Sequence, residues 1–138
     1  MPRTLCDASE LVVRAICSPN HFDPEAQRIS PNLFTGSEIS LSRLKLLTLE
    51  EHWSLFRQHV QKPHQRLELF GEIAVGPLQE IGLNYKAGPI DKPVPQPVTI
   101  TVEEAPEDWN PAHAEIPQKL TRGLANQIIP ALRLHKSA

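Results

Sequence analysis

Four stretches of the chain carry the apolar and polar pattern of β-strands, at residues 10–17, 38–44, 66–75 and 98–104. The first (ELVVRAIC) is apolar on both faces, which is typical of a strand at the centre of a sheet. The other three alternate, so that one face is mainly apolar and the other mainly polar. Segments 83–86 and 112–116 are shorter, and each is long enough for one further short strand.

Two stretches place apolar residues at the spacing of an α-helix. The first begins at Thr48, because Thr48 and Glu51 have the Thr-x-x-Glu order of a capping box. Its apolar stripe consists of Leu49, Trp53, Phe56 and Val60. The second begins near Pro117, and we expect Pro130 to kink it. Its apolar face consists of Leu120, Leu124, Ile128 and Leu132.

Proline and glycine mark shorter elements. Asp23–Pro24 and Ser30–Pro31 each place a capping residue before a proline, which is typical of the first turn of a short helix. Gly76–Pro77 opens another short helix that Gly82 ends. The order of all elements predicts an α+β domain. It has a small mixed or antiparallel sheet of about four to five strands, with two main helices packed on one face.

The chain of 138 residues suits a single domain spanning residues 1–138. Its 14 prolines are densest in residues 88–97 (GPIDKPVPQP). Because proline fixes its φ angle and has no backbone N–H, this segment cannot form a helix and adds little to a sheet. We interpret it as an extended, polyproline-like connector on the surface. It serves either as a plain connection or as a docking strip for a partner.

The charge pattern gives no reason to expect a nucleic-acid partner. Charged residues make up 22% of the chain, the formal net charge is −2, and the basic residues form no stripe. The apolar runs are too short to span a membrane, and the first residues lack the apolar region of a signal peptide. Cys6 and Cys17 do not make a disulfide framework. We therefore expect a cytoplasmic protein with reduced thiols and no membrane partner.

No complete metal or cofactor motif is present in the sequence. Cys17 and His21 make only half of a structural zinc site, and His52 and His59 are too far apart along a helix to share an ion. Residues 71–76 have the glycine spacing of a phosphate-binding loop, but the lysine and hydroxyl residue that such a loop needs do not follow. We expect neither a metal nor another cofactor.

Arg14 is the most unusual residue, because it lies within an apolar strand and a buried guanidinium needs a partner. Either it pairs with a buried acid such as Glu72 or Glu115, or it faces a pocket and binds an anion. His113 presents a similar choice, since its proline-rich surroundings are also suited to a plain connection into the last helix. The alternative function is therefore an enzyme or ligand-binding protein with a pocket around Arg14, Ser42, His113 and Glu115.

One form of that alternative resembles an ADP-ribosyltransferase in outline. Arg14, the sequence Ser40-Leu41-Ser42, and then Glu103 or Glu104 occur in the order found in such enzymes. The resemblance implies that Arg14 binds the phosphates of NAD and that the serines support the nicotinamide ribose. It also implies that the glutamate assists the transfer.

The chain as a whole resembles a family of small bacterial stand-alone proteins with no established activity. The matching segments are LVVRAI, RISPNLF, SEISLSRL, GEIAVG and NPAHAEI, and the likeness covers Leu11 to Ile128. It implies a stand-alone domain in which Arg14, Arg43 and His113 recur in place. Small proteins of this kind resemble partners in mobile-element, defence or toxin–antitoxin loci.

The function we predict from these observations is non-enzymatic binding to another protein. No set of catalytic residues is complete, and the net charge disfavours nucleic acid. The contact surface consists of the proline-rich connector, in particular Pro93 and Pro95, together with Trp109. The protein is then an accessory or partner subunit of a bacterial defence, toxin–antitoxin or mobile-element system.

Overall fold

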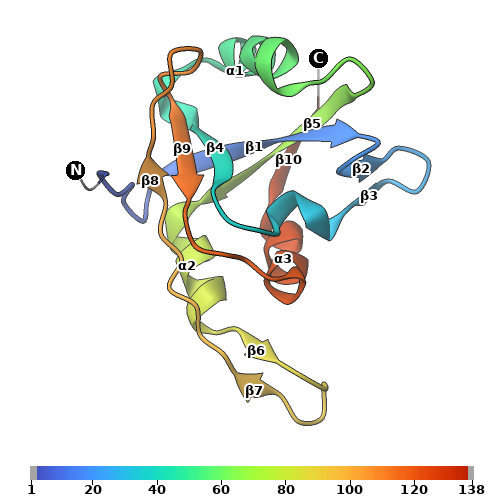
Figure 1. The fold of residues 1–138 in the computed structure, drawn as a ribbon, viewed down its shortest axis with the longest axis vertical. Coiled ribbons are helices and arrows are strands. Elements are labelled where there is room, and N and C mark those ends of the chain that lie inside the picture. Colours follow the sequence, from blue (N-terminus) through green and yellow to red (C-terminus); the bar gives the residue numbers. More distant parts are fainter. Residues whose placement is uncertain (1–2, 137–138) are drawn as a thin grey trace.

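The computed structural model describes residues 3–136 and has an antiparallel sheet at its centre (Figure 1). Six strands are arranged in the order β10-β5-β1-β4-β9-β8, and every neighbouring pair is antiparallel. The strands are β1 (Leu11–Ser18), β4 (Ile39–Arg43), β5 (Arg66–Ala74), β8 (Glu103–Glu104), β9 (His113–Ile116) and β10 (Arg133–Lys136). The predicted α+β class is confirmed, as is the inner position of the first strand.

Helices and small hairpins surround this sheet. The helices are α1 (Leu49–Leu55), which continues as the π-helical turn η3 (Phe56–Val60), α2 (Val75–Leu83) and α3 (Arg122–Ile128). The 3-10 turns are η1 (Pro31–Phe34), η2 (Leu44–Leu46) and η4 (Ile129–Ala131). The hairpins pair β2 (Phe22–Asp23) with β3 (Arg28–Ile29), and β6 (Lys86–Ala87) with β7 (Val94–Pro95). No helix within residues 3–136 is long and apolar enough to cross a membrane.

Helices cover both faces of the sheet, so the prediction that they lie on one face was wrong. On one face, Trp53 and Phe56 pack on Val13. The other face carries the larger part of the core, to which α2, α3 and η1 contribute Leu33, Phe34, Leu78, Leu124 and Ile128. The reason is visible in β1, where the successive residues Val12 and Val13 point to opposite faces and are both fully buried. A strand that is apolar on both faces needs cover on both.

The predicted helix starts have mixed outcomes. Thr48 and Glu51 form the reciprocal bonds of the capping box, as predicted. Ser30 caps η1 through its side chain, also as predicted. Asp23 caps only a turn between β2 and β3, and no helix follows Pro24. A capping residue before proline therefore indicates a local turn. Whether a helix follows depends on how the next residues pack against the rest of the fold.

The alternating segment 98–104 is only partly a strand. Ile100 and Val102 are buried, yet only Glu103–Glu104 pairs with β9 within the sheet. The backbone N–H of Thr101 instead donates to the side chain of Gln118 over 2.9 Å. The alternation of apolar and polar residues in this segment therefore indicates which side chains are buried, but it does not indicate that the backbone pairs with another strand.

The last helix is shorter than predicted, and a strand follows it. It begins after Thr121, whose side chain caps it, and not at Pro117. Pro130 lies in η4 and ends the helix where a kink was predicted, because proline cannot donate the next helical hydrogen bond. The chain then adds β10 to the edge of the sheet beside β5. The sequence did not predict that strand.

Candidate functional site

The guanidinium of Arg14 bridges a gap in the sheet. β1 and β4 pair only at Val12–Arg43 and Val13–Ser42, and the rest of the two strands is not paired. Arg14 Nη1 donates to the carbonyl oxygen of Ser40 over 2.7 Å, and Nε donates to that of Leu33 over 2.6 Å. Arg14 therefore supplies donors where the backbone ladder between β1 and β4 is missing.

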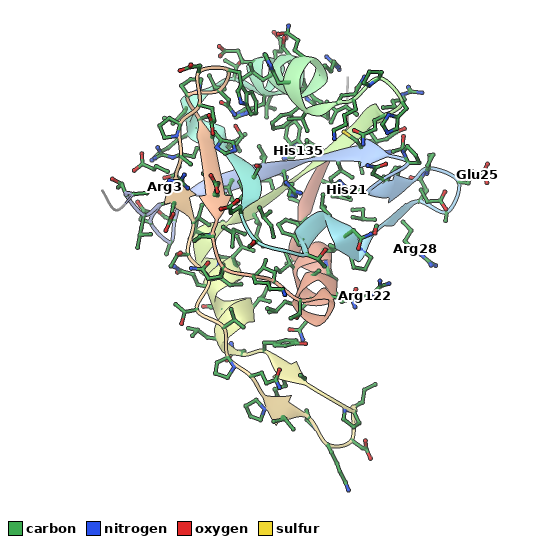
Figure 2. All side chains as sticks on the ribbon, viewed as in Figure 1. Arg3, His21, Glu25, Arg28, Arg122 and His135 are labelled. Carbon is green, nitrogen blue, oxygen red and sulfur yellow. The ribbon has the colours of Figure 1, made fainter. Side chains whose placement is uncertain are left out.

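Arg14 has no carboxylate partner, so the predicted ion pair with Glu72 or Glu115 is wrong. Glu72 Oε1 lies 2.9 Å from His135 Nε2, and Glu115 accepts from Arg3 Nη1 over 3.1 Å. Figure 2 labels Arg3 and His135, which come from the two ends of the described chain. Among residues 3–136, no salt bridge includes Arg14. Its charged group contacts two carbonyl oxygens and the ring of Phe34, whose centre lies 5.9 Å from Cζ.

A cavity of about 230 Å³ opens beside Arg14, on the face of the sheet that α1 and η3 cover. Its apolar walls include Val13, Cys17, Phe56, Val60 and Trp109. Its polar lining includes Arg14, Asn20, His21, Lys62, Gln65 and His113. None of the residues that line the cavity is an aspartate or a glutamate, although the chain as a whole has a net charge of −2.

His113 lies in the wall of this cavity with its ring held in place. Its Nδ1 is 2.7 Å from the carbonyl oxygen of Ala105, so Nδ1–H donates to that oxygen. The ring of Trp109 contacts the rings of His113 and His59, whose centres are 5.8 Å and 5.2 Å away. Trp109 is therefore a half-buried wall of the cavity.

Behind the cavity, Ser42 and His52 form a buried pair that sequence reasoning missed. Ser42 Oγ is 3.0 Å from His52 Nδ1 and accepts from Asn110 Nδ2 over 3.1 Å. His52 Nε2 lies 3.2 Å from the carbonyl oxygen of Leu44, so Nε2–H donates there and Nδ1 accepts the hydroxyl proton of Ser42. Burial lowers the pKa of His52, which keeps the ring neutral. The pair joins a strand to a helix, and no sequence motif marks it.

Burial also sets the protonation of the ionisable groups around the cavity. It lowers the pKa of Arg14 to about 10, so the guanidinium stays charged at neutral pH. It lowers the pKa of His21, with a further contribution from the positive charge of Arg14. It raises the pKa of Cys17, against the smaller effect of Arg14, so this residue remains a thiol. The only group among these three that carries charge at neutral pH is Arg14.

Some of the predicted site residues meet at the cavity and others do not. Arg14, His113 and Trp109 line it. Ser42 is opposite His113 in the sheet, but its hydroxyl belongs to the buried network. Glu115 lies outside the cavity lining, where it contacts Arg3. No group of three or more His, Cys, Asp or Glu side chains within residues 3–136 is arranged to hold a metal ion.

The glutamates of the ADP-ribosyltransferase outline are also outside the cavity lining. Glu104 accepts from Arg43 Nη1 over 2.6 Å, and Glu103 lies 3.8 Å from Arg3. Arg43 also binds both carboxylate oxygens of Glu10, which is buried. These contacts link the start of β1 to β4 and β8, so the carboxylates of Glu10 and Glu104 have structural roles.

Residues 88–95 of the proline-rich connector belong to an arm, residues 86–95, that projects from the body of the molecule (Figure 1). A hydrogen bond of 2.9 Å from Gln96 N to Tyr85 O closes its base. The side chain of Ile90 at its tip is 100% exposed and that of Val94 is 55% exposed. Pro93 and Pro95 are exposed as well.

The arm and Trp109 do not form one surface. Trp109 belongs to the loop between β8 and β9, which lies beside α1 at the other end of the molecule from the arm (Figure 1). Its ring contact with His59 of η3 agrees with that position. The two features that the sequence analysis combined are therefore separate candidates.

No protein-family model, curated protein or solved structure matches this chain. Its function has to be inferred from its own residues, and two places stand out. One is the cavity beside Arg14, and the other is the projecting arm.

Proposed function

We propose that the protein works by binding another protein through the arm. The observation that carries this proposal is Ile90, an apolar side chain that is fully exposed at the tip of a projection. Val94 and the exposed prolines extend the apolar surface along the same arm. Prolines restrict the free conformations of the arm, which lowers the entropy that is lost when a partner orders it.

The prolines also determine how a partner can contact the arm. The backbone N–H of Gln96 points toward the first strand of the arm, since it donates to Tyr85 O. Backbone nitrogens alternate between the two edges of a strand, so those of Pro95 and Pro97 lie on the outer edge. Pro93 precedes β7 and, like every proline, has no backbone N–H. The outer edge of β7 consequently has no N–H donor at these positions, and another strand cannot pair with it in the usual way. The partner then contacts side chains, through a groove that accepts prolines and the Ile90 side chain.

The resemblance to small bacterial stand-alone proteins supplies the setting of this proposal. In that setting the chain is a cytoplasmic, non-enzymatic accessory or partner subunit of a defence, toxin–antitoxin or mobile-element system. The partner is the protein whose activity the chain adjusts, and it is expected to be encoded near it.

The test compares two double variants of the tagged protein, each purified from the native host at natural expression. The arm variant carries Ile90→Ser and Val94→Ser. The control carries Leu46→Ser and Leu134→Ser, whose side chains are 44% and 48% exposed on other elements. We expect one protein to co-purify in fixed ratio with the wild type and the control. The arm variant should retain at least about tenfold less of it, because two central apolar contacts typically contribute more than 1 kcal/mol each.

Native mass spectrometry measures the ratio, and circular dichroism confirms that both variants are folded. Retention of the partner by the arm variant would place the contact elsewhere. A wild-type protein that purifies alone would contradict the proposal as a whole.

A further inference from the structure

The charge of Arg14 is partly free to interact with a ligand. The Arg14 side chain leaves β1 on the same face as Val12, where Nε donates to Leu33 O and Cζ lies 5.9 Å from the centre of the Phe34 ring. Its Nη1 donates to Ser40 O in the unpaired gap between β1 and β4, and no hydrogen bond of the described residues involves Nη2. Among the described residues, every buried side-chain nitrogen has a hydrogen-bond partner. Because Nη2 has none, it must be accessible to solvent. Arg14 lines the cavity beside β1, and that cavity has no acidic lining residue. A guanidinium in this position lacks the anion that a partly buried cation favours.

The size of the cavity limits what it can hold. A volume of about 230 Å³ corresponds to roughly eight water molecules at about 30 Å³ each. It is below the range of about 300–1,000 Å³ that is typical of sites for drug-sized ligands. A dinucleotide is therefore too large, and a molecule of about ten non-hydrogen atoms fits.

The walls of the cavity combine apolar and donor groups. Phe56, Val60 and Trp109 provide an apolar surface opposite the strand. Lys62 is exposed at the rim, and Gln65 is half-buried beside it. A strongly hydrated inorganic anion loses its water against such walls without replacement, whereas a molecule with an apolar body loses little.

We propose that this cavity binds a small organic carboxylate with a compact apolar body. The carboxylate lies at the Arg14 guanidinium, in the unpaired gap between β1 and β4, and the apolar body lies between Phe56 and Trp109. Lys62 at the rim attracts the anion toward the opening. This proposal is independent of the arm and of the protein partner proposed above.

The probe for the test is benzoate, with benzamide as its neutral counterpart of the same shape and inorganic phosphate as an anion without an apolar body. Each is titrated into the full-length, 15N-labelled protein and followed by NMR. We expect benzoate to shift the signals of Arg14, the Trp109 indole and His113 in a saturable way. Benzamide should bind at least about tenfold more weakly, because it lacks the charge that Arg14 attracts. Phosphate should leave the Trp109 signal unchanged.

A substitution at Arg14 can unfold the protein, because Arg14 bridges β1 and β4. The charge is therefore tested at Lys62, which is exposed. Lys62→Glu should weaken benzoate binding by roughly fivefold through reversal of one nearby charge. The control is Lys119→Glu, which makes the same change of net charge at an exposed residue outside the cavity lining. Its affinity for benzoate should equal that of the wild type.

Equal affinity for benzoate and benzamide would overturn the proposal, since charge would then play no part. The absence of saturable shifts with benzoate would overturn it as well. Saturable binding of phosphate at Arg14 without binding of benzoate would identify an inorganic-anion site and contradict the carboxylate. Equal weakening by the two lysine variants would show attraction to the whole chain and not to this cavity.

Discussion

Two arginines within residues 3–136 are partly buried, and the structure accommodates their charges in different ways. Arg43 binds two carboxylates, which raises its own pKa and lowers that of Glu10. Arg14 donates its hydrogen bonds only to carbonyl oxygens and lies against the Phe34 ring, and burial lowers its pKa. A charge-assisted pair with a carboxylate satisfies the cation within the fold. A pair of carbonyl oxygens leaves the net positive charge in place, which is why the ligand proposal concerns Arg14 and not Arg43.

Glu10→Gln should destabilise the protein by about 2 kcal/mol at pH 7. Breaking a fully buried ion pair typically costs about 3–5 kcal/mol, and the cost here is lower because Arg43 keeps Glu104 and some solvent contact. Urea unfolding measures the difference. Glu25→Gln, at an exposed turn position, serves as the control and should stay within about 0.5 kcal/mol of the wild type. A loss below about 0.5 kcal/mol for Glu10→Gln would mean that the cluster does not stabilise the fold.

Glu10→Gln should also make the free energy of unfolding depend less on pH in the acid range. The pKa of Glu10 is lower in the folded chain than its ordinary value of 4.5, mainly because Arg43 bonds to the carboxylate. The stabilisation is therefore complete above pH 4.5 and is lost as the pH falls through the lower folded pKa. The difference in unfolding free energy between wild type and variant should be constant above pH 4.5 and should shrink as the pH falls below 4.5. Curves that stay equally far apart would show that Glu10 does not titrate in this way.

At the scale of elements, the contact of α2 with the chain after the arm shows why some glycines are needed. Val98 N donates to Gly82 O over 2.8 Å, which holds segment 98–102 against the end of α2. A Cβ atom at Gly82 would overlap the carbonyl oxygen of Val98 and crowd the side chain of Ile100. The end of α2 was predicted from Gly82 as a helix stop, whereas the structure uses this residue for close packing.

Gly82→Ala should destabilise the protein by about 1–3 kcal/mol, because backbone must move to admit the methyl group. Gly123→Ala is the matched comparison within α3. Its methyl group would meet the hydroxyl end of the Tyr85 side chain, which can rotate away, while alanine favours the helix by about 1 kcal/mol. Thermal unfolding of both variants should show a lower Tm for Gly82→Ala only. Equal Tm values for the two variants would contradict the close packing at Gly82.

At the scale of the whole molecule, the arm is attached to the fold without supporting it. None of the core residues belongs to residues 86–95, and hydrogen bonding between Tyr85 and Gln96 already closes the base. The cavity beside Arg14 lies on the face covered by α1 and η3, and Trp109 in its wall belongs to the loop at the far end from the arm. The two proposed sites can therefore be altered separately.

Replacement of residues 86–95 by an Asn-Gly turn should leave stability within about 0.5 kcal/mol of the wild type. The turn fits, because Tyr85 and Gln96 are hydrogen-bonded neighbours in an antiparallel pair. Thermal unfolding and benzoate binding should be unchanged, and partner binding should be lost. A large drop in Tm would show that the arm supports the fold and would weaken its assignment as a contact surface.

Much of the fold could be predicted from local sequence, because local interactions decide it. Thr48 and Glu51 are three residues apart and satisfy each other within one helical turn. The doubly apolar segment 10–17 indicated a strand at an inner position in the sheet, and the prolines of 88–97 excluded a helix there. In each case the residues that make the structure are neighbours in the chain.

The site depended on contacts that local sequence does not describe. The partners of Arg14 are carbonyl oxygens of Leu33 and Ser40, on other elements, and a carbonyl oxygen has no side-chain signature. The pairing of Ser42 with His52 and the placement of Trp109 beside His59 also join separate elements. By itself, the sequence determined where strands and helix caps form and which side chains need burial. Only the packing of distant segments decided where the buried charge lies uncompensated and which residues surround it.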